Sequence, residues 1–123
     1  MLSVDEWWHL DDPAKVRLIE VVQCRHSDEP WYDNFFHCIK CEPHVLDAFV
    51  QRVNRQRLNG KNRIRHKYVV ETMRDEGVIM RNGKAFNLDN NFTADIARLS
   101  ALLFPELSGV FRFRTRAIGR KVA

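Results

Sequence analysis

Six side chains that can bind a transition metal lie close together in the first half of the sequence. They fall between positions 24 and 44, and they are Cys24, His26, His37, Cys38, Cys41 and His44. Cys38-x-x-Cys41 has the spacing with which zinc knuckles place two thiolates on Zn²⁺, and Cys24 or His44 would complete the ligand set. A structural zinc site is typically built from two such pairs, and this chain contains one. Because free cysteines also pack as small apolar side chains, we predict no cofactor and keep structural zinc as the alternative.

The second group of functional side chains is cationic, and its members are unevenly distributed along the chain. Residues 1–50 contain 4 Lys/Arg and 10 Asp/Glu, whereas residues 51–88 contain 10 and 3. Residues 109–123 contain 5 Lys/Arg and no acidic residue. The net charge of +4 therefore conceals an acidic first part followed by basic blocks. Such a split predicts that the basic part binds a polyanion, the alternative being an ordinary solvated surface.

The stretch FRFRTR, residues 111–116, alternates aromatic and basic side chains. Successive side chains of a β-strand point to opposite faces. As a strand, this stretch would direct its two phenylalanines and Thr115 toward a core and its arginines away from it. Those arginines are Arg112, Arg114 and Arg116. We predict a strand here, whose arginine row either contacts a ligand or merely protects an exposed sheet edge.

Catalytic motifs are missing from the sequence. It contains no glycine-rich phosphate loop and no nucleophile elbow. The carboxylates of the first half show no spacing that singles out an acid–base pair. A cysteine follows His37 directly, but adjacency in sequence does not supply the geometry that an activated thiol needs. We predict that the protein is not an enzyme.

The N-terminal third contains two helix-start signals. Ser3 and Glu6 have the spacing of a capping box, which predicts a short helix. Pro13, preceded by two aspartates, marks a second start. Residues 14–24 then form a helix or, because β-branched residues recur, a buried strand; we favour the helix. Residues 31–41 are rich in aromatic side chains and have no clear periodicity.

The remainder of the chain shows stronger periodicity. Apolar residues recur at helical spacing over 45–58 (Leu46, Phe49, Val50 and Val53), and over 62–76 (Ile64, Tyr68, Val69 and Met73). Gly60 and Gly77 follow these stretches as stop signals. Asn82-Gly83 predicts a β-hairpin turn, because both central residues of that turn need positive φ. A last helix is expected over residues 92–104, with Ile96, Leu99 and Leu103 facing inward.

The order of helix, connection, basic helix, glycine and hairpin over roughly residues 44–88 resembles a winged-helix domain, a variant of the helix-turn-helix. The matching stretch reads RHKYVVETMRDEGVIMRNGKAFNL. The resemblance implies that the second helix enters the major groove of DNA, where arginines can read guanine edges. The hairpin would contact phosphates, and the terminal strand would pair with it and extend one basic surface. The nucleic-acid-binding residues implied in this way are Arg63, Arg65, His66, Lys67, Arg74, Arg81, Lys84, Arg112, Arg114 and Arg116.

We therefore predict a single α+β domain over residues 1–123, mostly helical, with a small antiparallel sheet formed by the hairpin and the C-terminal strand. Residues 1–43 form an acidic, aromatic part and residues 44–123 a basic, winged-helix-like part. The predicted function is binding of nucleic acid, as a duplex-DNA regulator of transcription or an accessory factor. The alternative is a protein-interaction module, such as a small phage-type inhibitor or adaptor that binds an acidic protein partner. A homodimer is a further option.

The predicted location is the cytoplasm. The sequence shows no secretory signal and no apolar run of membrane-spanning length. Three cysteines cannot form a closed set of disulfides, which favours a reducing compartment. No membrane partner is expected.

Overall fold

The fold is known from a computed structural model. It describes residues 2–32, 34–76, 80–81, 84–85 and 90–111, and of residues 80–81, 84–85 and 90–91 it describes the backbone alone.

Two capped helices open the chain, as predicted. In α1 (Val4–Trp8), the Ser3 hydroxyl accepts a hydrogen bond from the Glu6 amide and the Glu6 carboxylate accepts one from the Ser3 amide, which completes the capping box. α2 (Asp12–Arg25) begins after Asp11, whose carboxylate accepts from the Ala14 amide. The helical reading of residues 14–24 is therefore confirmed over the strand alternative.

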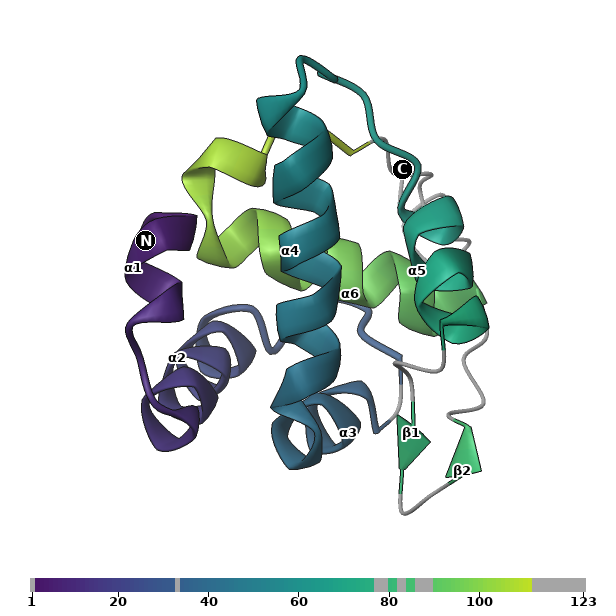
Figure 1. Ribbon diagram of the computed structural model, residues 1–123. Helices are drawn as coiled ribbons and strands as arrows, with labels where there is room; N and C mark the ends of the chain where they lie inside the picture. Colours follow the sequence, from purple (N-terminus) through teal and green to yellow (C-terminus); the bar gives the residue numbers. More distant parts are fainter. Residues whose placement is uncertain (1, 33, 77–79, 82–83, 86–89, 112–123) are drawn as a thin grey trace, which may run out of the picture.

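The remaining helices of the described part follow α2 in the sequence. α3 (Phe35–Cys41) leads into α4 (Pro43–Leu58), and α5 (His66–Asp75) follows. α6 (Asn90–Leu103) and a short 3-10 helix, η1 (Pro105–Leu107), complete the described part. Figure 1 shows α4 crossing in front of α6, with α1 and α2 on one side and α5 on the other. α6 packs against α2, α4 and α5, so it joins the acidic first part of the chain to the basic middle.

One connected cluster of buried side chains fills the space between these helices. The apolar positions predicted for α4 and α6 are all buried, which confirms the periodicity of both stretches. Trp7 of α1 reaches the same core and contacts Phe104 edge to face, with 5.3 Å between ring centroids. The N-terminal aromatic residues thus close one end of the core.

The buried face of α5 differs from the prediction at one residue. Tyr68 was expected to point inward, but 59% of its surface is exposed. α5 begins at His66 instead of near residue 62, and its buried positions are Val69, Val70 and Met73. Ile64 is also buried, but it lies in the connection before the helix. Counting Ile64 as helical therefore assigned Tyr68 to the wrong face.

The predicted α+β class is wrong, because the described part of the chain is built from helices. β1 (Met80–Arg81) and β2 (Lys84–Ala85) pair antiparallel, with Met80 opposite Ala85. Strands of two residues bury no face and supply no layer of a core. Phe111 begins the predicted terminal strand but lies outside any strand, and residues 112–116 fall outside the described residues. The contacts of α6 with α2, α4 and α5 form the core of the described part from helices alone.

The end of the described chain lies beside the start of α5. The Ile64 amide donates a hydrogen bond to the Val110 carbonyl, with 2.8 Å between nitrogen and oxygen. The Phe111 ring stacks on Phe49 of α4 at 5.8 Å and meets the His66 ring at 6.2 Å. Phe111 is therefore an aromatic anchor, as predicted, although it is held by ring packing instead of strand pairing.

Among the described residues, no helix has both the length and the apolar composition needed to cross a bilayer.

Candidate nucleic-acid interface

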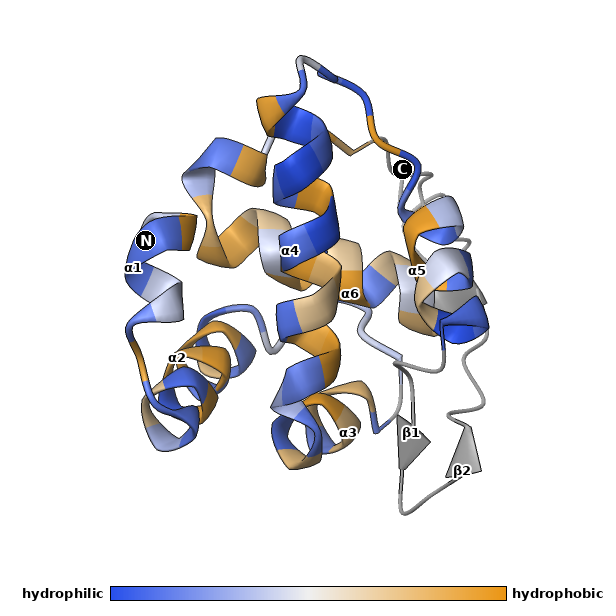
Figure 2. Cartoon of the chain, in the orientation of Figure 1, coloured by the Kyte–Doolittle hydropathy of each residue, from blue (hydrophilic) through white to orange (hydrophobic). Residues whose placement is uncertain are grey.

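The segment from Arg55 to Lys67 contains six Lys/Arg and no acidic residue. We call it the basic connection. It comprises the last turn of α4, the link over residues 59–65 and the first residues of α5. Figure 2 shows this region in mostly hydrophilic colours along the outer edge of the molecule, with hydrophobic colour at the end of α4 and at one position of the link. That position is Ile64.

Local geometry explains why the cations of the link point outward. The chain leaves α4 through Gly60, whose φ of +93° is a conformation that side chains other than glycine rarely adopt. Arg65, the last residue before α5, is extended, with φ −84° and ψ 104°. Neighbouring residues of an extended chain face opposite sides. Because Ile64 points into the core, Arg63 and Arg65 on either side of it point into solvent.

Within the described part of the chain, most cations of the basic connection have no acidic partner. Lys61, Arg63, Arg65 and Lys67 are exposed, and none forms an ion pair with any residue that the structure describes. Arg57 differs, because it donates to Glu106 at 3.2 Å and also to the side chain of Asn54. The local positive charge is therefore balanced only in part within the described protein.

The first turn of α5 lacks the acidic side chains that usually stabilise the start of a helix. Helices are stabilised by acidic side chains in the first turn and basic ones in the last. α5 has no acidic residue in its first turn and no side-chain cap at Arg65, whereas Glu71, Asp75 and Glu76 lie in its second half or directly after it. Arg52 of α4 pairs with Glu76. The positive end of the helix dipole thus adds to the field of the basic connection.

His66 contributes differently from its neighbours. It is half-buried, with its ring against Phe111. Burial lowers the pKa of His66 below its ordinary value of 6.5, because desolvation penalises the charged imidazolium. At neutral pH this residue therefore packs against Phe111 and adds no positive charge.

The other basic residues implied by the winged-helix resemblance are not gathered at this place. Arg74 is exposed in the last turn of α5. Arg81 and Lys84 occupy paired positions of β1 and β2, a pair that Figure 1 shows beyond the far end of α5. Arg112, Arg114 and Arg116 lie outside the described residues, although Phe111, directly before them, lies against His66.

The candidate zinc ligands are dispersed over three helices. Cys24 is exposed on α2, and Cys38 and Cys41 lie on α3. His44 on α4 lies 3.3 Å from a Glu42 oxygen. Within the described residues, no three potential metal ligands come together. The structure therefore offers no four-ligand arrangement in this part of the chain.

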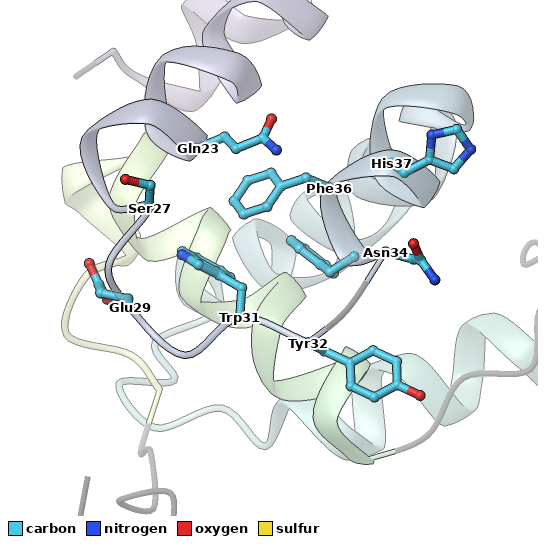
Figure 3. A pocket seen from close by; sticks show the side chains of 9 residues that line it. Gln23, Ser27, Glu29, Trp31, Tyr32, Asn34, Phe36 and His37 are labelled. Atoms are coloured by element: carbon cyan, nitrogen blue, oxygen red, sulfur yellow. The ribbon is translucent and has the colours of Figure 1, made fainter. Parts of the chain in front are cut away.

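The aromatic acidic part contains a cavity of about 410 Å³. Figure 3 shows Trp31 and Phe36 beside it, with Gln23, Ser27 and Glu29 around the edge. Two of its polar groups are engaged within the protein: Glu29 pairs with Arg98 and His26, and Gln23 accepts a hydrogen bond from Lys40. Arg98 also lies 4.5 Å from the centroid of the Trp31 ring. These contacts indicate that the cluster mainly stabilises the fold.

Sequence reasoning missed three residues of the surface around the basic connection. Arg55 and Lys61 were absent from the residues implied by the resemblance, and Tyr68 was assigned to the core. All three are exposed. The uninterrupted run of positive charge from Arg55 onward was the available signal for the first two.

Comparisons with protein-family models, with curated protein sequences and with solved structures found no match to this chain.

Proposed function

We propose that the protein binds nucleic acid through the basic connection. The observation that carries the proposal is the set of four exposed cations that follow α4 and form no ion pair with a described residue: Lys61, Arg63, Arg65 and Lys67. Such cations form phosphate contacts at little desolvation cost, and each contact releases condensed counterions from the nucleic acid. The proposal concerns binding and involves no catalytic step.

The winged-helix resemblance remains a prediction beside this proposal. α5 packs against α4, as a recognition helix packs on its partner. The link between them spans residues 59–65, which is longer than the roughly three or four residues of a helix-turn-helix turn. The resemblance implies duplex DNA as the ligand. We propose that ligand, and a regulatory role in the cytoplasm, together with the resemblance.

Titration of labelled oligonucleotides by fluorescence anisotropy tests the proposal. Four phosphate contacts predict that the logarithm of the binding constant falls with the logarithm of salt concentration with a slope of about −4 on duplex DNA. The double variant R63A/K67A removes two of these cations. It should bind at least about tenfold more weakly and show a slope smaller by about 2.

The matched control is R17A/R25A, which removes the same charge from exposed positions of α2. Figure 1 shows α2 across α4 from α5, so this variant should keep affinity within about twofold of the original protein. Equal losses in both double variants would mean that only net charge matters, and would overturn the assignment to the basic connection.

An acidic protein is the alternative partner for the same surface. Absence of salt-sensitive binding to any oligonucleotide, together with copurification of one protein whose capture is lost in R63A/K67A, would replace the nucleic-acid proposal with that one.

A further inference from the structure

We infer that the nucleic acid bound by the basic connection is single-stranded and that Tyr68 stacks on one of its bases. This inference rests on the proposed function and departs from the duplex DNA that the winged-helix resemblance implies. It is drawn from the outward face of α5, which combines an exposed aromatic ring with a sharp change of charge along the helix.

The side chain of Tyr68 is exposed, and the packing of α5 does not depend on it. Its ring lies in the first turn of α5, directly after Lys67, and 59% of the residue is exposed. The packing of α5 on α4 and α6 is supplied by Val69, Val70 and Met73. Aromatic rings next to cations are the usual platform for unpaired bases, because every base offers a π-face while the cations hold the backbone.

Two carboxylates of the outward face oppose a duplex. At 100° per residue, Glu71 and Asp75 lie on the same side of α5 as Lys67, Tyr68 and Arg74, and both carboxylates are exposed. Neither forms an ion pair with a residue that the structure describes. A duplex that received this helix along its major groove would bring phosphates of two strands close to both carboxylates, and like charges repel.

A single strand avoids this repulsion. α5 is about 15 Å long, and after Lys67 in its first turn its next cation is Arg74 in its last turn. One strand that follows the link over residues 61–65 and places a base on Tyr68 contacts Lys61, Arg63, Arg65 and Lys67 and stays clear of Asp75. Single-stranded DNA and RNA share this backbone and these base faces, so the chemistry on the surface fits both.

Anisotropy titrations with a labelled dT20 strand, an rU20 strand and a 20-base-pair duplex test the inference at one salt concentration. We expect at least one of the two single strands to bind about tenfold more tightly than the duplex. The more tightly bound of the two identifies DNA or RNA as the natural class. Equal or tighter binding of the duplex would overturn the inference.

Substitutions of Tyr68 give the second arm. Y68A should weaken binding of the single strand by roughly tenfold and leave the duplex unchanged, whereas Y68F keeps the ring and should keep the affinity. Because Tyr68 is mostly exposed, both variants should retain the far-UV circular dichroism of the original protein. Equal affinity of Y68A and the original protein for the single strand would refute the stacking role.

Removing the carboxylates gives the third arm. E71Q/D75N should strengthen duplex binding more than single-strand binding, by about fivefold or more. The two proposals fail in different ways. If R63A/K67A binds every oligonucleotide as the original protein does, the proposed function is wrong. The other case is that R63A/K67A loses affinity, the original protein binds the duplex more tightly than either single strand, and Y68A binds the single strand as the original protein does. In that case only the single-strand inference is wrong.

Discussion

Asp47 holds the acidic N-terminal part of the chain to α4, and replacing it tests how that part is attached. One carboxylate oxygen accepts a hydrogen bond from the Trp7 indole nitrogen at 2.8 Å. The other pairs with the Lys15 ammonium at 3.1 Å. The side chain of Lys15 is only 9% exposed and that of Asp47 27%. Lys15 also lies 5.4 Å from the centroid of the Trp7 ring, so α1, α2 and α4 meet at this one contact.

The cost of D47A follows from these contacts. Removing one partner of a buried pair leaves an uncompensated charge and costs about 3–5 kcal/mol. Because Asp47 is partly exposed, the low end of about 3 kcal/mol applies, and the lost indole hydrogen bond adds about 1 kcal/mol. We expect D47A to lower the free energy of unfolding by about 4 kcal/mol, which for a chain of this size lowers Tm by roughly 15 °C.

A double-mutant cycle separates the charge from the packing. K15M removes the buried cation and keeps an apolar stem of similar length, and such replacements are close to neutral or stabilising when the partner is removed too. D47A/K15M should therefore be more stable than D47A by about 2 kcal/mol or more. Urea unfolding followed by tryptophan fluorescence measures all four proteins. A double variant no more stable than D47A would refute the view that Lys15 is held by its charge partner.

Two further predictions concern the residues that position the basic connection. I64A removes the buried anchor between Arg63 and Arg65, so we expect the free energy of unfolding to fall by about 2 kcal/mol or more. The variant should still fold but bind oligonucleotides more weakly. Unchanged affinity would show that Ile64 does not position the binding residues. Since the pKa of His66 is lowered by burial, the unfolded chain binds more protons than the folded protein as pH falls below 6.5. The contribution of His66 to stability is thus complete above pH 6.5 and lost below it. The free energy of unfolding should therefore fall less between about pH 7.5 and about pH 5.5 in H66Q than in the original protein. An equal fall in both proteins would contradict this role of His66.

Local signals in the sequence were sufficient to predict those helix ends and buried faces that depend only on nearby residues. The capping box of Ser3 and Glu6 predicted the start of α1 correctly, because its hydrogen bonds join residues three positions apart. The apolar periodicity of α4 and α6 predicted their buried faces, since a continuous helix keeps its face from one turn to the next. The concentration of positive charge in the middle of the chain is likewise a property of the sequence alone.

Tertiary contacts decided what the candidate site is made of. Ile64 has the same apolar side chain in a helix or in a link, and its hydrogen bond to the distant Val110 holds it in the link. α5 therefore begins at His66, and Tyr68 turns outward beside the cations. Phe111 alternates with arginine as a strand residue would, yet a strand needs a partner, and Phe111 packs on Phe49. Periodicity reports which side chains share a face; which contact that face meets depends on residues far away in the sequence.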